Sequence, residues 1–296
     1  MYTSGFIRVL WEEGWIIMLI ENVDWQITCQ CNRTCKYCFG PSNVGTMEID
    51  EIYQVIDILT RGGVKQIGIT GGEPLTHPFI SDIISFANKM GLKIYLSTNC
   101  DYYSKYSEII KEKVSIIGLP LDGANQQTHD LHRGNNSYQN IFDAINDICN
   151  SNCNLKIKVG TVVTKFNFGE LIDIEKLISA YSSKILFWKL YEMISYDRNI
   201  YFTEDLKYDF RNLNITLGQY FDAQRIVYDT ISKRNKSYFF IKPNGDVFIP
   251  ELNRGISTET VIGNILKDSF DNLASRFEKH VNIQGYYKEY RYMKSN

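Results

Sequence analysis

Short hydrophobic runs alternate with longer segments of helical period along the first two thirds of the chain. The short runs are rich in β-branched residues and predict strands, whereas apolar residues spaced three or four apart predict the buried face of a helix. The predicted strands cover 23–28, 66–70, 93–97, 115–119, 156–163 and 185–191, and the predicted helices cover 49–61, 79–90, 138–150 and 170–180. Such alternation predicts an α/β fold, in which a parallel sheet closes wholly or partly into a (β/α)6 barrel.

The alternation ends near residue 198. A helix is predicted over 218–233, and the segment 237–250 predicts a hairpin that turns on Pro243, Asn244 and Gly245. A polar, tyrosine-rich segment closes the chain. We therefore expect a core barrel over 23–197, an N-terminal extension over 1–22, and a C-terminal extension over 198–296 that packs on the barrel and covers it.

Composition adds few constraints on partners. The 296 residues are 44% hydrophobic and 22% charged, as in ordinary soluble domains, and a net charge of -2 gives no general attraction to nucleic acid or anionic lipid. The longest apolar run near the N-terminus, 15–20, is far too short to span a membrane, and no signal-peptide cleavage site follows it. We expect a cytoplasmic protein without nucleic-acid or membrane partners. Residues 1–17 match no later pattern, so Met18 is an alternative start.

Four of the seven cysteines lie in the segment CQCNRTCKYCFG, residues 29–40. Cys31, Cys35 and Cys38 have the spacing C-x3-C-x2-C, with no second cysteine pair for a zinc site and an odd cysteine left over from any disulfide framework. Three thiolates on one loop suit a [4Fe–4S] cluster whose fourth iron stays open to a small molecule. We expect Cys29 to be a packed thiol, and the other three cysteines to be buried apolar residues.

Further polar motifs directly follow the predicted strands. The cysteines come after the first strand, GGEP (71–74) after the second, STN (97–99) after the third, and Asp122 after the fourth. Taken alone, GGEP is typical of a turn before a helix, and Asp-Gly of a simple turn. Because the C-terminal ends of parallel barrel strands meet at one face, the ordered series predicts a single site there.

This series resembles the radical S-adenosylmethionine (SAM) superfamily. The resemblance implies a partial barrel of the radical SAM type and two cofactors, a [4Fe–4S] cluster and SAM. It also implies an electron donor of the flavodoxin or ferredoxin kind, and cleavage of SAM to a 5′-deoxyadenosyl radical that takes hydrogen from the substrate. No side chain beyond the cofactors is expected to be catalytic. The implied cluster ligands are Cys31, Cys35 and Cys38, and the implied SAM-binding residues are Tyr37, Gly71, Gly72, Glu73, Pro74, Ser97, Asn99, Asp122 and Arg133.

The expected substrate rests on a narrower resemblance. The segments QCNRTCKYCF, GVKQIGITGGEP, KVGTVVTKFN, FWKLYEM and SYFFIKPNGDVF are similar, in this order, to the viperin-like enzymes. That similarity implies an antiviral lyase that dehydrates a nucleoside triphosphate to its 3′-deoxy-3′,4′-didehydro form. The similarity implies three substrate-binding lysines: Lys158 and Lys189 fall where these enzymes have lysines that face the triphosphate, and Lys165 lies near a further basic position.

Two alternatives stay open. The segment PLDGANQQTHDLHRG looks more like the peptide-modifying radical SAM proteins, so a maturase acting on a precursor peptide is the main alternative. The absence of cysteines after Cys153 predicts a single cluster in either case. An iron–sulfur sensor without enzymatic activity is a third reading, which would need neither GGEP nor an open iron.

Overall fold

The computed structural model describes residues 11–12, 15–16, 20–35, 37–38, 40, 44–196, 205–253 and 256–291. The alternative start at Met18 and the expected domain boundary at residue 197 lie outside the described residues. Near the N-terminus, β1 (Trp11–Glu12) and β2 (Trp15–Ile16) pair with each other in a small antiparallel sheet.

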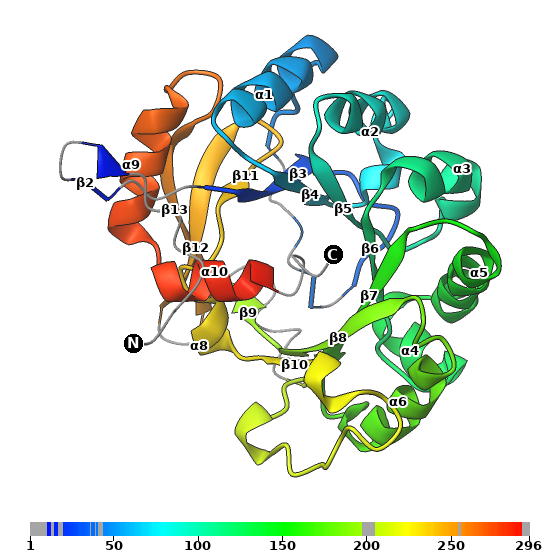
Figure 1. The fold of residues 1–296 in the computed structure, drawn as a ribbon. Coiled ribbons are helices and arrows are strands. Elements are labelled where there is room, and N and C mark those ends of the chain that lie inside the picture. The colour runs from blue at the N-terminus through cyan, green and yellow to red at the C-terminus, as the bar shows by residue number, and fades with distance from the viewer. Residues whose placement is uncertain are drawn as a thin grey trace.

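The six predicted core strands are confirmed. They are β3 (Asn22–Thr28), β4 (Gln66–Gly71), β5 (Lys93–Ser97), β6 (Ile116–Pro120), β7 (Lys156–Val163) and β8 (Ile185–Glu192). They lie side by side in chain order, and each pairs in parallel with the next. Figure 1 shows these strands as part of a ring with the helices outside it, as expected for a radical SAM type of partial barrel.

Later strands extend this sheet at both edges. On one side, β10 (Ile226–Asp229) pairs in parallel with β8. On the other, β11 (Phe240–Ile241) pairs in parallel with β3, and β12 (Asp246–Asn253), β13 (Ile256–Asn264) and β9 (Ser195–Tyr196) follow in that order. The C-terminal residues therefore supply strands of the same sheet and do more than cover the barrel.

The connection between β8 and β9 shows that the sheet curls round on itself. Only Met193 and Ile194 separate these strands in the chain, so their ends lie within about 11 Å of each other. Along the sheet, however, β9 lies nine strand positions from β8, which would be about 43 Å in a flat sheet. The two edges must therefore face each other across a nearly closed barrel.

The outer layer consists largely of amphipathic helices. These are α1 (Ile49–Arg61), α2 (Ile80–Lys89), α3 (Tyr103–Lys113), α5 (Ser137–Asn150) and α6 (Leu171–Ser179). In α1, a capping box of Glu48 and Glu51 satisfies the first backbone N–H groups, and the buried face carries Ile52, Val55 and Leu59.

Two helices of the barrel region, α3 and α4 (Gln126–Arg133), were not predicted because their apolar faces are weak. In α3 only Tyr103 and Ile110 are fully buried. The short α4 buries two histidines, His129 and His132, and no aliphatic side chain. Neither segment shows the regular apolar spacing that identifies a helix in a sequence.

The predicted helix over 218–233 is wrong. The segment instead forms a 3-10 turn (Ala223–Arg225), strand β10 and a four-residue helix, α8 (Ile231–Arg234). The side chains of Asp222 and Thr230 cap the two short turns, which divides the segment. Residues Ile226–Asp229 form a strand because they pair with the open edge of β8. These tertiary contacts override the weak local preference for a helix.

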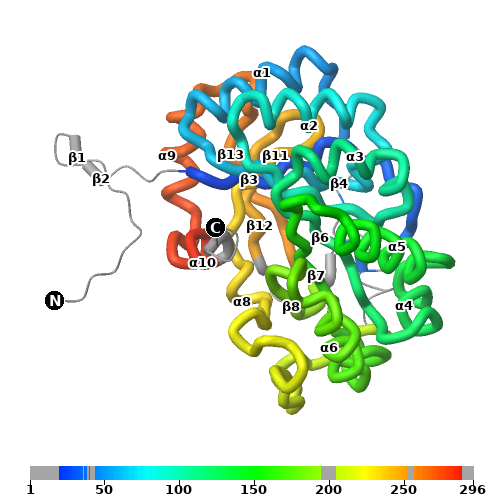
Figure 2. The backbone as a smooth tube through the Cα atoms, turned by 45° about the vertical axis from the view of Figure 1, so that its right-hand side comes forward, coloured from blue at the N-terminus to red at the C-terminus, as the bar shows by residue number. Residues whose placement is uncertain are grey.

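The predicted hairpin around Gly245 is confirmed, and it is followed by two helices that the sequence analysis missed. These are α9 (Phe270–His280) and α10 (Ile283–Arg291), which lie on the β11–β13 side of the barrel (Figure 2). The fully buried Tyr286 of α10 donates its hydroxyl hydrogen to the Asn22 carbonyl at 2.8 Å and accepts the Asn22 N–H at 3.0 Å. The end of the chain is thereby fastened to the first barrel strand.

Candidate active site

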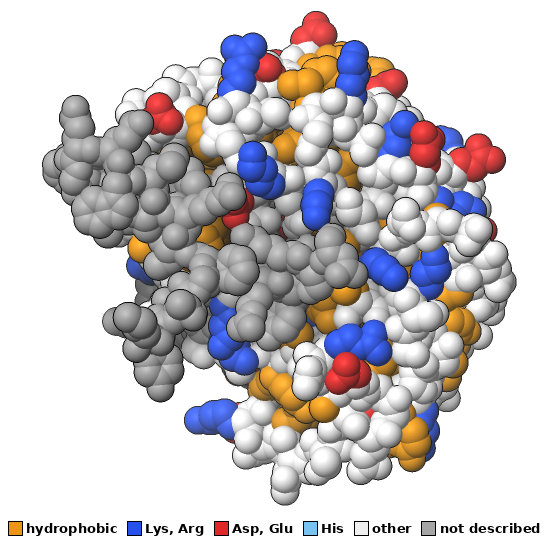
Figure 3. Space-filling model, viewed as in Figure 1, with side chains coloured by type: hydrophobic (Ala, Val, Ile, Leu, Met, Phe, Trp, Pro, Cys, Tyr) orange, Lys and Arg blue, Asp and Glu red, His pale blue; other side chains and the backbone are white. Residues whose placement is uncertain are grey.

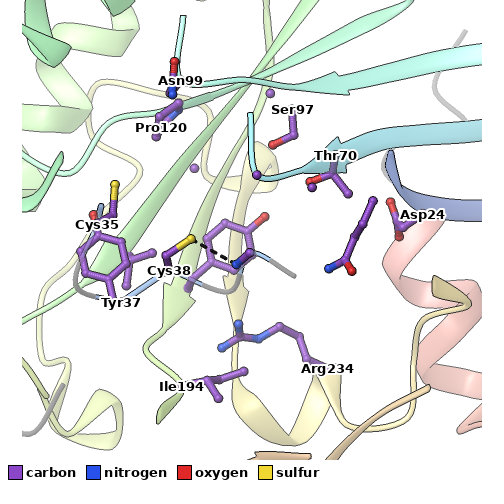
Figure 4. A pocket seen from close by; sticks show the side chains of 18 of the residues that line it. Asp24, Cys35, Tyr37, Cys38, Thr70, Ser97, Asn99, Pro120, Ile194 and Arg234 are labelled. Carbon is purple, nitrogen blue, oxygen red and sulfur yellow. Dashed lines mark hydrogen bonds between the residues drawn. The ribbon is translucent and has the colours of Figure 1, made fainter. Parts of the chain in front are cut away.

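A cavity of about 370 Å³ lies inside the barrel, and its walls come from nearly every part of the sheet. The alternation along β3 explains why polar side chains face it. Val23, Trp25 and Ile27 are buried toward the helices, whereas Asp24 and Gln26 line the cavity. Figure 4 shows cysteines on one side of this space and the Asp24 and Arg234 side chains at other parts of its wall.

The three expected cluster ligands, Cys31, Cys35 and Cys38, all line this cavity. Cys29 does not line it. Its thiol lies 3.6 Å from the Val44 carbonyl oxygen, as expected for a packed thiol. No group of three His, Cys, Asp or Glu among the described residues is arranged around a single metal ion. A [4Fe–4S] cluster does not need three ligands around one metal ion, because each cysteine binds a different iron.

The cysteine sulfurs fit thiolate ligands of a cluster. The Gly40 backbone N–H donates to the Cys38 sulfur at 3.1 Å, and the Arg33 N–H donates to the Cys31 sulfur at 3.4 Å. Hydrogen bonds of this kind stabilise negative charge on sulfur. Burial raises the pKa of Cys31 and of Cys35, so both are thiols in the absence of metal, and a bound cluster would displace their protons.

A buried ion pair holds the cysteine loop against the barrel. The Asp122 carboxylate is fully buried and accepts hydrogen bonds from the Tyr37 hydroxyl and the Arg133 guanidinium, both at 2.6 Å, and from the Val162 N–H at 2.7 Å. Burial alone would raise the pKa of Asp122, but Arg133 and His129 outweigh it, and the pKa lies below its usual value. Asp122 is therefore an anion that fixes Tyr37 and Arg133. Tyr37 and Arg133 line the cavity, whereas Asp122 does not.

The GGEP motif packs closely on the cysteine loop. A Cβ on Gly72 would lie 2.1 Å from the Gln30 carbonyl oxygen, and one on Gly71, whose φ is +134°, would lie 2.4 Å from the Thr28 carbonyl oxygen. The Glu73 N–H donates to the Gln30 carbonyl at 2.7 Å. Glycine is needed at 71 and 72 for this approach, which brings the motif beside the cluster ligands.

The Glu73 side chain joins two loops of the site. Its buried carboxylate accepts hydrogen bonds from the Thr98 hydroxyl and the Asn99 N–H, both at 2.7 Å, and from the Leu75 N–H at 3.0 Å. Burial raises the pKa of Glu73, although these donors oppose the increase. Glu73, Ser97 and Asn99 line the cavity, whereas Pro74 is buried at the start of a 3-10 turn and does not. The donors and acceptors expected to hold SAM thus surround the cysteines.

Comparison with known protein families agrees with this geometry. The sequence model of the radical SAM superfamily matches residues 25–178, just over half of the chain. The chain belongs to the radical SAM superfamily. As a radical SAM enzyme it uses a [4Fe–4S] cluster and SAM, for which the three cysteines and the surrounding loops supply a fitting set of ligands.

Individual relatives differ in how much of the chain they match. An S-adenosylmethionine-dependent nucleotide dehydratase of Flammeovirga pacifica is 21% identical to this chain over 288 residues. The match covers 91% of this chain and 96% of that protein. The subtilosin biosynthesis protein AlbA of Bacillus subtilis is 33% identical over 116 residues, but these cover 37% of this chain and 26% of that protein. Among solved structures, SuiB of Streptococcus suis bound to S-adenosylmethionine superposes with a TM-score of 0.70 at 15% identity, over 92% of this chain and 68% of SuiB. This likeness shows the shared radical SAM fold.

The structure separates the three lysines that the sequence analysis grouped at the substrate. Lys158 lines the cavity. Lys189 is buried, but its ammonium pairs with the Asp229 carboxylate at 3.1 Å and it does not line the cavity. Lys165 is exposed beyond the end of β7. The pairing of Lys189 depends on β10, which carries Asp229 and which the sequence assigned to a helix.

The sequence analysis missed several residues of the cavity wall. They are the strand residues Asp24, Gln26, Tyr95 and Tyr191, together with Arg234 of α8. A signal for them exists, because glycines at 68, 118 and 160 leave room inside the barrel for larger neighbours. A Cβ at these glycines would lie 2.1 Å from the Asp24 carboxylate, 2.2 Å from the Tyr95 hydroxyl and 3.1 Å from the Tyr191 ring, respectively.

Figure 3 shows how charged side chains are distributed on one face of the molecule. On the described part of that face, Lys and Arg side chains are spread around the molecule with Asp and Glu among them. Within the described residues, no helix has the length and apolar character needed to cross a membrane.

Proposed function

We propose that this radical SAM enzyme is a lyase that dehydrates a nucleoside triphosphate. The observation that carries the proposal is Lys158, a cation placed inside the barrel on the cavity wall. Its residue is 8% exposed, its ammonium donates to the Tyr95 hydroxyl at 3.0 Å and to the Tyr191 hydroxyl, and no carboxylate of the described residues pairs with it.

A buried cation without a counter-charge is costly, since loss of hydration is not offset by ion pairing. An anionic substrate would supply that counter-charge. The two phenols orient the ammonium but carry no charge of their own when protonated. A phosphate group bound at Lys158 would satisfy the site, and several phosphates would also use Arg234, which lies on the same cavity.

Arg234 is held ready at this wall by the C-terminal part of the chain. Its guanidinium donates to the Glu192 carbonyl, lies 3.6 Å from the Asp229 carboxylate, and sits 5.5 Å from the centre of the Tyr191 ring. Planar guanidinium groups bind phosphate oxygens well. The match to a nucleotide dehydratase over 91% of this chain supports the same substrate class, because it includes the segment that carries Arg234.

The chain's own residues have defined tasks in this reaction. Lys158 and Arg234 bind the phosphates, while the Asp122 and Glu73 hydrogen bonds hold the cofactor loops in place. The nearly closed barrel keeps water from the reacting atoms. When bound, the reduced cluster and SAM supply a 5′-deoxyadenosyl radical that takes a hydrogen atom from the substrate. We include in the proposal a flavodoxin-like or ferredoxin-like electron donor, a cytoplasmic location and a role in antiviral defence.

The direct test uses anaerobically reconstituted enzyme with SAM, a reductant and each nucleoside triphosphate in turn. We expect at least one nucleotide to increase the formation of 5′-deoxyadenosine and to yield a product that has lost one water by mass spectrometry. If no nucleotide changes 5′-deoxyadenosine formation while SAM is still cleaved, the nucleotide proposal is wrong.

A peptide-modifying maturase remains the second candidate. The match to AlbA has the highest of the three identities given above, although it covers 37% of this chain. A precursor peptide would replace the nucleotide in the assay. Modification of a peptide without any response to nucleotides would favour this alternative.

A further inference from the structure

Gln26 is a buried polar residue whose side-chain oxygen has no partner. The residue lies on β3, is 2% exposed and lines the cavity, and its Oε1 atom accepts no hydrogen bond from the described residues. Leaving a buried acceptor unsatisfied costs on the order of 1–3 kcal/mol. Such an atom on the wall of a binding cavity points to a hydrogen bond that the ligand completes.

Its neighbour on the same face of β3 is also an acceptor. Asp24 precedes Gln26 by two positions, so both side chains point into the barrel, and the Asp24 carboxylate lies across Gly68 of β4. Asp24 lines the same cavity and is labelled on its wall in Figure 4. Two neighbouring acceptors favour a ligand group that donates, such as an N–H or O–H.

This acceptor pair and the proposed phosphate-binding side chains come from different elements, since Arg234 lies on α8. Lys158 lies on β7, four strands away from β3 in the sheet, so the two walls bind different parts of one ligand. A ligand with anionic groups at Lys158 and Arg234 would direct its uncharged part toward β3. In a nucleotide that part is the ribose or the base.

We infer that Asp24 and Gln26 form a subsite that accepts hydrogen bonds from the sugar hydroxyls or the amino group of a nucleotide and thereby selects among substrates. This inference rests on the proposed function. It assigns β3 to substrate choice, whereas the cysteine loop that follows β3 serves the cofactors. The Asp24 carboxylate has no hydrogen to donate and therefore rejects a ligand that places its own acceptor beside it, and the Gln26 Oε1 atom disfavours such a ligand as long as this oxygen faces the cavity.

The test measures dissociation constants by calorimetry on cluster-loaded enzyme in the presence of SAM. Two pairs of ligands show whether the donating group is the amino group of the base or a hydroxyl of the sugar. Cytidine and uridine triphosphates differ in an amino group, and cytidine and 2′-deoxycytidine triphosphates differ in a hydroxyl. We expect the donor-bearing member of at least one pair to bind about tenfold more tightly, and we expect Gln26→Leu to reduce that ratio to about one.

One control and one further subsite variant separate selection from general damage. Gln139→Leu makes the same substitution at an exposed position of α5 outside the cavity and should leave the ratio unchanged. Asp24→Asn keeps the shape of its side chain and should reduce the ratio in part. Iron content and the unfolding midpoint establish that each variant is folded and loaded.

The outcomes also distinguish this inference from the proposed function. Equal binding within both pairs by the unaltered enzyme overturns the inference but leaves nucleotide binding intact. The inference is also overturned if Gln26→Leu lowers the affinity for all three nucleotides by the same factor, since that result indicates a structural role for Gln26. If none of the three nucleotides binds, the inference is wrong, and if adenosine and guanosine triphosphates also fail to bind, the proposed function is wrong as well.

Discussion

The two ends of the cavity are built in different ways. At the cysteine end, loops are tied to one another, and buried charges are paired within the protein. Asp122 is bound by Tyr37 and Arg133, and Glu73 is bound by Thr98 and Asn99. At the other end, single side chains project from the middle of strands. There the Lys158 ammonium donates to two phenols but pairs with no carboxylate of the described residues, and the Gln26 oxygen accepts no hydrogen bond from them.

This difference indicates which parts of the site are complete before a ligand arrives. The network around the cysteines satisfies its own hydrogen bonds and so holds the cofactor loops rigidly. The strand residues around Lys158 gain their missing partners from a substrate. Changes at the cysteine end should therefore damage cofactor loading and stability, whereas changes at the other end should alter substrate binding alone.

The largest effect is expected from the cluster ligands. Cys35→Ala removes one of three thiolates and should abolish both cluster binding and SAM cleavage, since two cysteines cannot hold the cluster on three irons. Iron analysis and 5′-deoxyadenosine formation measure the two losses. Cys29→Ala is the matched control on the same loop, and it should retain iron and activity because its thiol bonds Val44. Loss of iron in Cys29→Ala would contradict the assignment of three ligands.

Asp122→Ala tests the rigid network itself. It leaves the Arg133 guanidinium without its buried partner, and breaking such a pair lowers the free energy of unfolding by about 3–5 kcal/mol. Urea unfolding under anaerobic conditions measures the change. Asp173→Ala removes an exposed partner of Lys176 and should change the same quantity far less, because solvent screens an exposed ion pair. Equal changes in the two variants would show that the Asp122 network contributes no more to the free energy of unfolding than an exposed ion pair does.

The contrast between the two ends also explains what the sequence could predict. Cofactor residues lie in short contiguous motifs, such as Cys31–Cys38 and Gly71–Glu73, because one loop must bring several groups to one ligand. The residues that we propose to face the substrate come from single positions on separate elements, so no local pattern marks them. Lys158 was identified by resemblance, but its separation from Lys189 became visible only through Asp229 on β10. The pairing of an edge strand is a tertiary event that local sequence does not encode.

Lys158→Met tests the substrate end. It removes the cation from the cavity but keeps a long side chain, and we expect triphosphate affinity to fall about tenfold to a hundredfold, on the order of 1–3 kcal/mol. SAM cleavage without nucleotide should persist, because Lys158 lies away from the cysteine loop on β7. Lys165→Met is the control, since Lys165 is exposed outside the cavity. A similar loss in both variants would contradict a specific role for Lys158.

Gly118→Ala should have the smallest effect, and it tests how the phenols orient Lys158. The added Cβ would lie 2.2 Å from the Tyr95 hydroxyl, which must move away from its position 3.0 Å from the Lys158 ammonium. The added Cβ would also lie 2.8 and 2.9 Å from two carbons of the Tyr95 ring, so the outer part of the ring must move, but because this ring borders the cavity the fold should survive. We expect triphosphate affinity to fall about threefold to tenfold, roughly 1 kcal/mol for one weakened hydrogen bond, with SAM cleavage unchanged.

Two further variants show whether that loss comes from the hydrogen bond or from the added methyl group. Tyr95→Phe removes the hydroxyl without adding a Cβ and should reproduce the loss. Gly169→Ala adds a methyl group where no atom lies within 4 Å and should have no effect. Reduced affinity in Gly118→Ala together with normal affinity in Tyr95→Phe would indicate that the methyl group obstructs the cavity. Lys158 would then depend on Tyr191 for its position, and the substrate end would be held by fewer contacts than the structure suggests.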